Sequence, residues 1–238
     1  MAKLWGGRFK QELDPDAKAF SYSLSYDKRL AVFDIKVNRA QAKALHHKGL
    51  LSKSDYDLVD KTLQDLLTTI NKNNEESAKL FSGDDEDIHS CIERLVTEKI
   101  GDLGKKIHTG KSRNDQVITD MRLYLKSELE KIDELLSQLL KTIWDLSKAH
   151  SNIIFPGMTH LQPAQPVLFS HHLLAYFNKF ERDKERFKST YQTTDVCALG
   201  SGALAGNNYE LDRDLIAREL GFSKITQNSM DAVSDRDF

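Results

Sequence analysis

The stretch that decides the fold reads His108-Thr109-Gly110-Lys111-Ser112-Arg113-Asn114-Asp115-Gln116. From Asn114 to about His150 the chain has no glycine or proline, and apolar residues recur at helical spacing. The stretch therefore predicts a polar loop that ends at a helix N-terminus, where unpaired N–H groups and the helix dipole favour anions. Arg113 can hold a carboxylate with two parallel hydrogen bonds. Ser112-x-x-Asp115 equally fits a helix cap among solvated cations, and the nine residues alone leave both readings open.

The long segment after this stretch points to an all-α fold. Its apolar stripe would make a helix several times the usual length of about 11–12 residues. Such a helix needs neighbours along its whole length, so we predict a bundle shared between subunits. The sequence thus predicts a small N-terminal helical domain, residues 1–111, followed by the first part of a long central helical bundle, residues 112–238. No segment has the pattern of a credible strand.

The N-terminal part is expected to contain several shorter helices. Residues 1–27 have no clear period and are expected to be irregular. Apolar spacing then predicts one helix that stops at Gly49 and a second that is capped by Ser52 or Ser54. Polar residues at 71–77 are expected to form a loop.

Composition and charge argue against several classes of partner. The 238 residues carry a formal net charge of -2, which gives no reason to expect nucleic acid or an anionic membrane. Cys91 and Cys197 fit no metal spacing and are expected to be buried thiols in a reducing compartment. The acidic run at 82–87 lacks the ligand alternation of a calcium loop and suits a helix start better. With no signal core and no bilayer-spanning run, the expected location is the cytoplasm.

A proline-rich segment, residues 156–166, interrupts the helical pattern. Three prolines and a glycine are expected to stiffen a loop that presents Thr159, His160, Gln162 and Gln165. An imidazole can give or take a proton near neutral pH, which makes His160 a candidate acid or base. A histidine that holds the loop shut by bonding its carbonyl groups fits the sequence as well.

The rest of the chain is predicted to return to helices. Residues 167–191 are expected to form a second long helix, and residues 211–220 a shorter one that ends at Gly221. The glycine-rich segment at 200–206 lacks the spacing of a nucleotide loop, and no strand precedes it. We expect its small residues to allow close approach of the backbone.

The two polar segments lie at opposite ends of the long predicted helix. At 1.5 Å per residue that helix would span roughly 50 Å, so Arg113 and His160 of one chain cannot easily meet. If both serve one site, the site must combine different subunits, which favours an oligomer with antiparallel helices.

These motifs resemble those of the argininosuccinate lyases, a branch of the fumarase/aspartase superfamily. The resemblance is carried by the 108–116 stretch and by Thr159-His160-Leu161-Gln162-Pro163-Ala164-Gln165-Pro166. It extends to Leu4-Trp5-Gly6-Gly7-Arg8-Phe9, Asp84-x-Glu86-Asp87-Ile88-His89, Leu199-Gly200-x-Gly202-Ala203-Leu204-Ala205-Gly206 and Asn228-Ser229-x-Asp231-Ala232-Val233-Ser234-Asp235-Arg236-Asp237. Because the motifs keep their order, the resemblance covers essentially the whole chain.

The resemblance implies a reversible β-elimination in arginine biosynthesis, in which argininosuccinate gives arginine and fumarate. It implies a reaction without metal or cofactor, and a homotetramer with active sites shared between subunits. His160 matches the catalytic histidine, as a proton donor or acceptor or as an orienting group. The matched substrate-binding positions are Ser23, Arg113, Asn114, Thr159 and, more weakly, Gln165.

One feature of the family is missing from this sequence. The family carries a later mobile loop with a catalytic serine, further bundle helices and a C-terminal helical domain, whereas this sequence stops at Phe238. We therefore expect an N-terminal fragment that is inactive alone. Two other hypotheses stay open: a crystallin-like structural homologue, and a sister lyase of the adenylosuccinate lyase or aspartase type.

Overall fold

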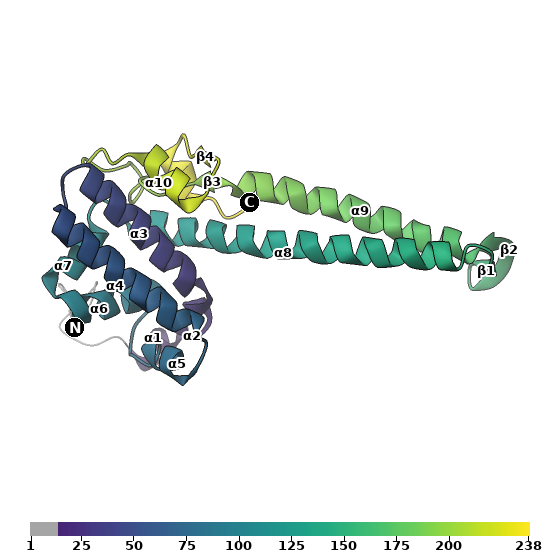
Figure 1. Cartoon of the computed structure of the whole chain (residues 1–238), viewed down its shortest axis with the longest axis horizontal. Helices are drawn as coiled ribbons and strands as arrows, with labels where there is room; N and C mark the ends of the chain where they lie inside the picture. Colours follow the sequence, from purple (N-terminus) through teal and green to yellow (C-terminus); the bar gives the residue numbers. More distant parts are fainter. Residues whose placement is uncertain (1–13) are drawn as a thin grey trace.

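The longest element, helix α8 (Arg113–Ala149), has 37 residues and carries the architecture. The structure is a computed structural model that describes residues 14–238. At its N-terminal end α8 joins a body of shorter helices, and its other end projects away from that body beside α9 (Phe169–Thr194) (Figure 1). The predicted segment, from Asn114 to about His150, agrees with the observed helix to within one residue at each end. The resembling motif at residues 4–9 lies outside the described residues.

The N-terminal body contains more helices than the apolar spacing predicted. In chain order they are α1 (Pro15–Ser21), α2 (Leu24–Asp27), η2 (Lys28–Leu30), α3 (Ala31–His47), α4 (Lys53–Asn71), α5 (Glu75–Leu80), α6 (Ile88–Ile100), α7 (Asp102–Lys105) and η3 (Lys106–His108). The stop near Gly49 and the Ser52 cap are confirmed, since the Ser52 hydroxyl accepts from the Asp55 N–H.

Two expectations for this region were wrong, and capping explains both. Residues 15–21 and 24–27 are helical rather than irregular, and α1 begins where it does because the Asp14 carboxylate caps it and Pro15 stands in its first turn. Residues 71–77 are only partly a loop, because Asn74 and Ser77 form a capping box that starts α5. Such short helices carry too few apolar residues to show a helical period.

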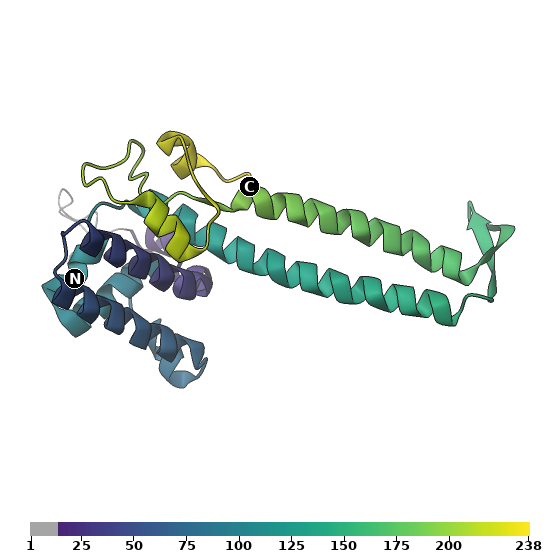
Figure 2. The same ribbon diagram turned by 45° about the horizontal axis from the view of Figure 1, so that its top comes forward.

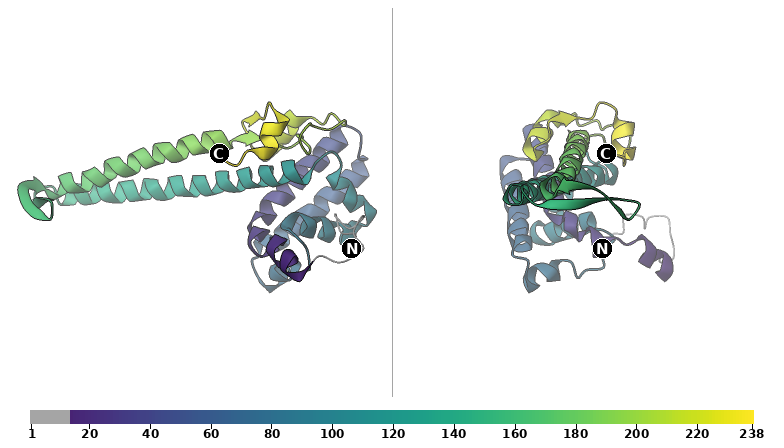
Figure 3. Two further views of the ribbon diagram at one scale, coloured as in Figure 1. Left: turned by 180° about the vertical axis from the view of Figure 1, so that it is seen from behind. Right: turned by 90° about the vertical axis from the view of Figure 1, so that its right-hand side faces the viewer.

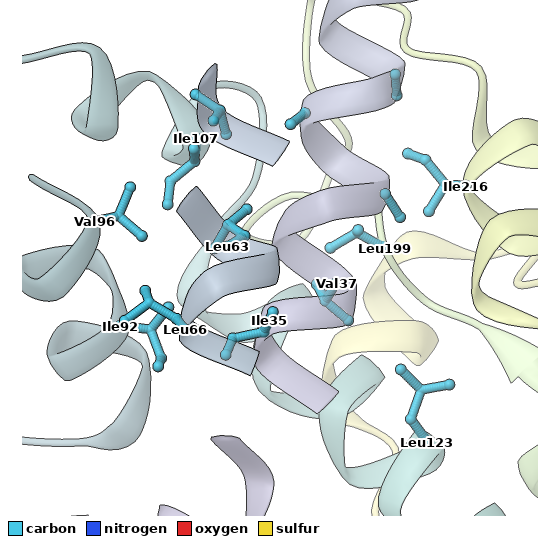
Figure 4. Close-up of a cluster of buried hydrophobic side chains, with 14 of the residues drawn as sticks. Ile35, Val37, Leu63, Leu66, Ile92, Val96, Ile107, Leu123, Leu199 and Ile216 are labelled. Carbon is cyan, nitrogen blue, oxygen red and sulfur yellow. The ribbon is translucent and has the colours of Figure 1, made fainter. Parts of the chain in front are cut away.

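Helix α3 lies at the centre of the hydrophobic core (Figure 4). On one side it faces α4 and α6, where Ile35, Leu63 and Ile92 are fully buried. On its other side lie Leu199 and Ile216, from the C-terminal part of the chain. Burying an aliphatic side chain of this size stabilises the fold by roughly 1.5–3 kcal/mol.

The C-terminal residues return to the body after α9. They form β3 (Val196–Cys197), α10 (Arg213–Leu220), β4 (Lys224–Ile225) and α11 (Ser229–Ser234). Helix α10 packs on α3 and α11 packs on α8, and α10 ends at Gly221 as expected, with a left-handed backbone. One core therefore contains residues from both sides of position 111, where the sequence predicts a domain boundary, and that boundary stays a prediction.

Helices α8 and α9 form a long antiparallel hairpin that stands clear of the body (Figure 2). In the outer part of α8, only Ile143 and Ser147 are buried after Leu129, and in α9 only Thr194 is buried. Large apolar side chains such as Leu135 and Trp144 are 63% and 44% exposed. The apolar stripe predicted for a bundle is present, but within this chain much of it has no cover.

The proline-rich segment is a β-hairpin, so the expectation of no strand was wrong. Strands β1 (Ile154–Thr159) and β2 (Gln162–Leu168) pair antiparallel across the far end of the helical hairpin (Figure 3). Prolines fit here because both strands of a two-stranded ribbon are edges, with N–H groups that need no partner strand. β3 and β4 form a second, parallel pair. The all-α class is otherwise confirmed, since helices make up most of the described chain.

No helix among residues 14–238 combines the length and the apolar character that crossing a bilayer requires.

Candidate active site

The start of α8 is capped as one of the two sequence readings proposed. The Ser112 hydroxyl accepts from the Asn114 N–H at 3.3 Å, and the Asp115 carboxylate accepts from the Ser112 N–H at 2.8 Å. This capping box fixes the direction in which the first turn presents Arg113 and Asn114. Arg113 is half-buried rather than solvated, so the cap and a binding role are compatible.

The guanidinium of Arg113 lies among acceptors from α6 and α8. Its shortest contact is from Nη1 to Oε1 of Gln116, at 2.8 Å. The carboxylates of Glu93 and Asp87 and the hydroxyl of Ser90 lie at 3.4 Å. These three longer contacts are weak, so Arg113 is held in place while most of its hydrogen-bonding capacity stays available to another anion.

Ser23, the residue that precedes α2, comes to the same place. Its N–H donates to the carbonyl of Glu86 at 2.8 Å, and its hydroxyl donates to the carboxylate of Asp27 at 2.5 Å. Asp87, the next residue after Glu86, caps α6 and contacts Arg113. The fold thus brings Ser23 and Arg113 to one helix start, although the sequence separates them widely.

The acidic run that precedes α6 is accounted for by these caps and by ion pairs. Asp85 is buried and pairs with Arg94 at 2.8 Å, while the Asp87 carboxylate accepts from the Ser90 N–H. Asp84 pairs with Lys18 at 2.5 Å. The expectation that this run serves a helix start is met.

Asn114 faces the glycine-rich segment. Its side-chain amide donates to the carbonyl of Ala203 at 3.1 Å. The buried Asp115 carboxylate holds that segment by accepting from the N–H groups of Gly200 and Gly202, at 3.0 and 2.8 Å. A Cβ at Gly202 would lie 2.5 Å from the carbonyl oxygen of Gly206, so close approach does require glycine there.

We call Ser23, Arg113 and Asn114 the proximal group, and Thr159, His160 and Gln165 the hairpin group. The hairpin group lies beyond the outer end of α8 on β1, β2 and their turn, and all three of its side chains are exposed. Helix α8 alone separates the two groups by about 55 Å at 1.5 Å per residue. The fold brings each group together but does not bring the two groups together within one chain.

His160 occupies the turn between the two strands. His160 and Leu161 form a two-residue connection, with φ angles of 51° and 62°. Such left-handed backbone is costly for residues other than glycine and is concentrated at functional sites. Among the described residues the His160 ring makes no hydrogen bond, so the reading in which it holds a loop shut was wrong.

A buried ionic cluster behind the proximal group was missed from the sequence. It consists of Asp34 on α3, His89 on α6 and Asp120 on α8, whose ligand-type atoms lie within 4.8 Å of one another. Burial by itself lowers the pKa of His89, but the two carboxylates raise it to about 10. Burial and the charge of Asp34 raise the pKa of Asp120 well above its usual range. Three residues on three separate helices leave no local signal in the sequence.

The spacing of these three residues would by itself allow them to bind a metal ion. Asp34, however, already accepts from two amides, and the ammonium group of Lys111 bonds to Asn38 beside it. Burial raises the pKa of Asp34, but His89 and Lys111 outweigh that effect and lower it below its usual range. The cluster therefore carries its own positive charge, and its chemistry does not call for a metal.

A protein family described as "Lyase" matches residues 7–238. The chain belongs to this lyase family. It is 50% identical over 236 residues to an argininosuccinate lyase of Thermoanaerobacter pseudethanolicus, covering 99% of this chain and 52% of that protein. It is 47% identical over 238 residues to the argininosuccinate lyase of Desulforudis audaxviator, covering 100% of this chain and 51% of that protein. The chain spans about half the length of these relatives.

Solved structures support the fold. An EDDS lyase in complex with formate aligns with a TM-score of 0.79 at 23% identity, over 93% of this chain and 42% of that one. A fumarate lyase/delta crystallin from Brucella melitensis, bound to cobalt, aligns with a TM-score of 0.70 at 16% identity, over 97% and 53%. At these identities the likeness concerns the arrangement of helices.

Proposed function

We propose that this chain supplies the N-terminal half of an argininosuccinate lyase, which splits argininosuccinate into arginine and fumarate. The observation that carries the proposal is 47–50% identity to lyases of that name along the whole chain. The geometry of both polar groups supports it, because their residues are the ones that the motif resemblance singles out.

The proximal group suits the substrate's carboxylates. The first turn of α8 presents the positive end of the helix dipole, and Arg113 adds a fixed cation beside it. The Ser23 hydroxyl and the Asn114 amide can each give a further hydrogen bond. Negative charge that develops when a proton leaves the carbon beside a carboxylate would be held by these preorganised donors.

The hairpin group suits the proton transfers. His160 stands on a turn, and its ring makes no hydrogen bond in the part of the chain that the structure describes, so its nitrogens are available to substrate or to an orienting partner. Thr159 and Gln165 flank it as further hydrogen-bonding side chains. The elimination also needs protonation of the guanidino leaving group, and we assign the serine that completes this chemistry to a part of the enzyme outside this chain.

The distance between the groups requires that copies of the chain assemble. An antiparallel neighbour would bring the hairpin group of one copy to the proximal group of another, because in each copy the two groups lie at opposite ends of a helix of the same length. The exposed Leu135 and Trp144 support such packing, because buried in a bundle they would no longer face water. We propose a homotetramer with shared active sites. Buried free thiols at Cys91 and Cys197 agree with a reducing, cytoplasmic location.

The test is turnover, followed through the ultraviolet absorbance of fumarate. The longer protein that contains this chain should cleave argininosuccinate but neither adenylosuccinate nor aspartate, while the 238-residue chain alone should give no fumarate. Turnover of adenylosuccinate or aspartate instead would identify a sister lyase. No turnover of any of the three by the longer protein would leave a structural, crystallin-like role.

A further inference from the structure

The buried cluster is connected to Arg113 by an unbroken series of hydrogen bonds. Nδ1 of His89 lies 2.8 Å from Oδ1 of Asp34, and that same oxygen accepts from Nε2 of Gln116 at 2.5 Å. The other end of the Gln116 amide, Oε1, accepts from Nη1 of Arg113 at 2.8 Å. The series therefore runs from the protein interior to the guanidinium.

The orientation of the Gln116 amide is set by Asp34. A carboxylate can only accept hydrogen bonds, so the amide must turn its NH₂ group towards Asp34 and its carbonyl towards Arg113. Gln116 is fully buried and has no room to exchange these partners for water. Asp34 is itself fixed, because Asn38 donates to its second oxygen at 2.8 Å and Lys111 bonds to the Asn38 carbonyl.

The two acids of the cluster, Asp34 and Asp120, differ in their hydrogen-bond partners. Asp34 accepts from His89, from Gln116 and from Asn38. Asp120 is equally buried, but within residues 14–238 neither of its oxygens has a hydrogen-bond partner, although Oδ2 lies 3.2 Å from Nδ1 of His89. Asp34 thus behaves as the ionised acceptor that holds Gln116, whereas Asp120 lies beside His89 without contacting Gln116, and its raised pKa agrees with a neutral carboxyl group.

We propose that Asp34 and Gln116 are positioning residues that orient Arg113 for a substrate carboxylate. The inference rests on the proposed lyase function and deepens it, since it names what aims the anion-binding side chain. Gln116 keeps Nη1 engaged from within the protein, while the other contacts of the guanidinium are long enough to yield to a ligand. Without Gln116 the guanidinium would turn towards Glu93 and Asp87, which compete with the substrate for it.

The first experiment compares two variants of the longer protein. Gln116→Met has similar length but makes no hydrogen bond, and we expect it to raise KM for argininosuccinate roughly tenfold or more with kcat nearly unchanged. Asp120→Asn is the matched control from the same helix and cluster, and its KM should stay within about twofold of the wild type. A variant that only unfolds part of the enzyme population would lower kcat and leave KM alone.

The second experiment exchanges the carboxylate and the amide. Gln116→Glu alone would set two carboxylates against each other, whereas Asp34→Asn/Gln116→Glu restores a donor at 34 and an acceptor at 116. We expect the double variant to recover a large part of the KM lost in Gln116→Glu, which also decides the matter if Gln116→Met does not fold. Unchanged KM in a folded Gln116→Met, or no recovery in the double variant, would overturn the proposal. Absence of argininosuccinate turnover in the wild type would overturn the lyase function itself.

Discussion

The inner and outer ends of α8 belong to one helix but have opposite surroundings. At the inner end, Asp115 and Gln116 are fully buried and are held by the glycine segment and by Asp34 of α3. Asp120 is also fully buried there, next to His89 of α6. At the outer end, apolar side chains such as Leu135 and Trp144 face outwards, and the hairpin group is exposed. The comparison teaches that the inner end is completed within its own chain, whereas the outer end leaves apolar and polar side chains uncovered, as the proposed assembly of several copies requires.

The largest expected effect concerns the exposed histidine of the outer end. His160→Asn in the longer protein should lower kcat by about 10²–10⁴-fold, the range for losing a general acid or base, with folding intact. His47→Asn is the control, because His47 is also exposed but lies on α3 in the body. Steady-state kinetics and circular dichroism measure the two outcomes. Unchanged turnover in His160→Asn would remove this residue from the mechanism.

The next prediction compares how the two ends of α8 contribute to stability. Leu123→Ala at the buried inner end should cost about 2–5 kcal/mol of unfolding free energy at every protein concentration. Leu135→Ala at the exposed outer end should weaken self-association instead. Urea unfolding at several concentrations, with sedimentation to measure the oligomer, distinguishes them. Equal losses that do not depend on concentration would contradict the difference between the ends.

A smaller effect concerns the pH dependence of the inner end. Asp34 on α3, His89 on α6 and Lys111 ahead of α8 surround Asp120, and burial raises the pKa of that carboxyl group in the folded state. A raised pKa stabilises the fold below the unfolded value of 3.8, and this contribution is lost as the pH rises. Asp120→Asn removes that loss, so the unfolding free energy of the variant, relative to that of the wild type, should increase from pH 5 to pH 8. A difference between the two proteins that stays constant over this range would show that Asp120 is already ionised in the folded state.

The last prediction is that removing metal ions has no effect on the protein. If the ionic cluster is held by Lys111 and His89 rather than by a metal, prolonged treatment with EDTA should leave Tm and turnover unchanged. Differential scanning fluorimetry before and after dialysis measures this, with added Zn²⁺ or Mn²⁺ as the reverse control. A fall in Tm that the metal restores would reassign Asp34, His89 and Asp120 as ligands.

The same contrast explains how much could be predicted from the sequence. Sustained apolar spacing gave the limits of α8, and local signals gave the Ser112–Asp115 capping box and the end of α10 at Gly221. The β-hairpin was missed because its prolines suggested a loop and its turn uses His160 and Leu161, not the usual asparagine and glycine.

The candidate site was predicted unevenly for related reasons. Motif residues at 113, 114 and 160 stand out because they are polar and cluster in the sequence. Gln116 could be read as part of the motif, but its role depends on Asp34, which comes from another helix. Contacts between distant helices, as in the buried cluster, leave no periodic or local pattern, so only the folded arrangement reveals them.

The central claim is that Arg113 of one copy and His160 of another complete one site. The most direct measurement mixes two separately inactive forms of the longer protein, Arg113→Met and His160→Asn, after dissociation and reassembly. The account predicts that fumarate production returns in the mixture, because some sites then combine an intact proximal group with an intact hairpin group. Mixed oligomers that form but remain as inactive as either parent would contradict it.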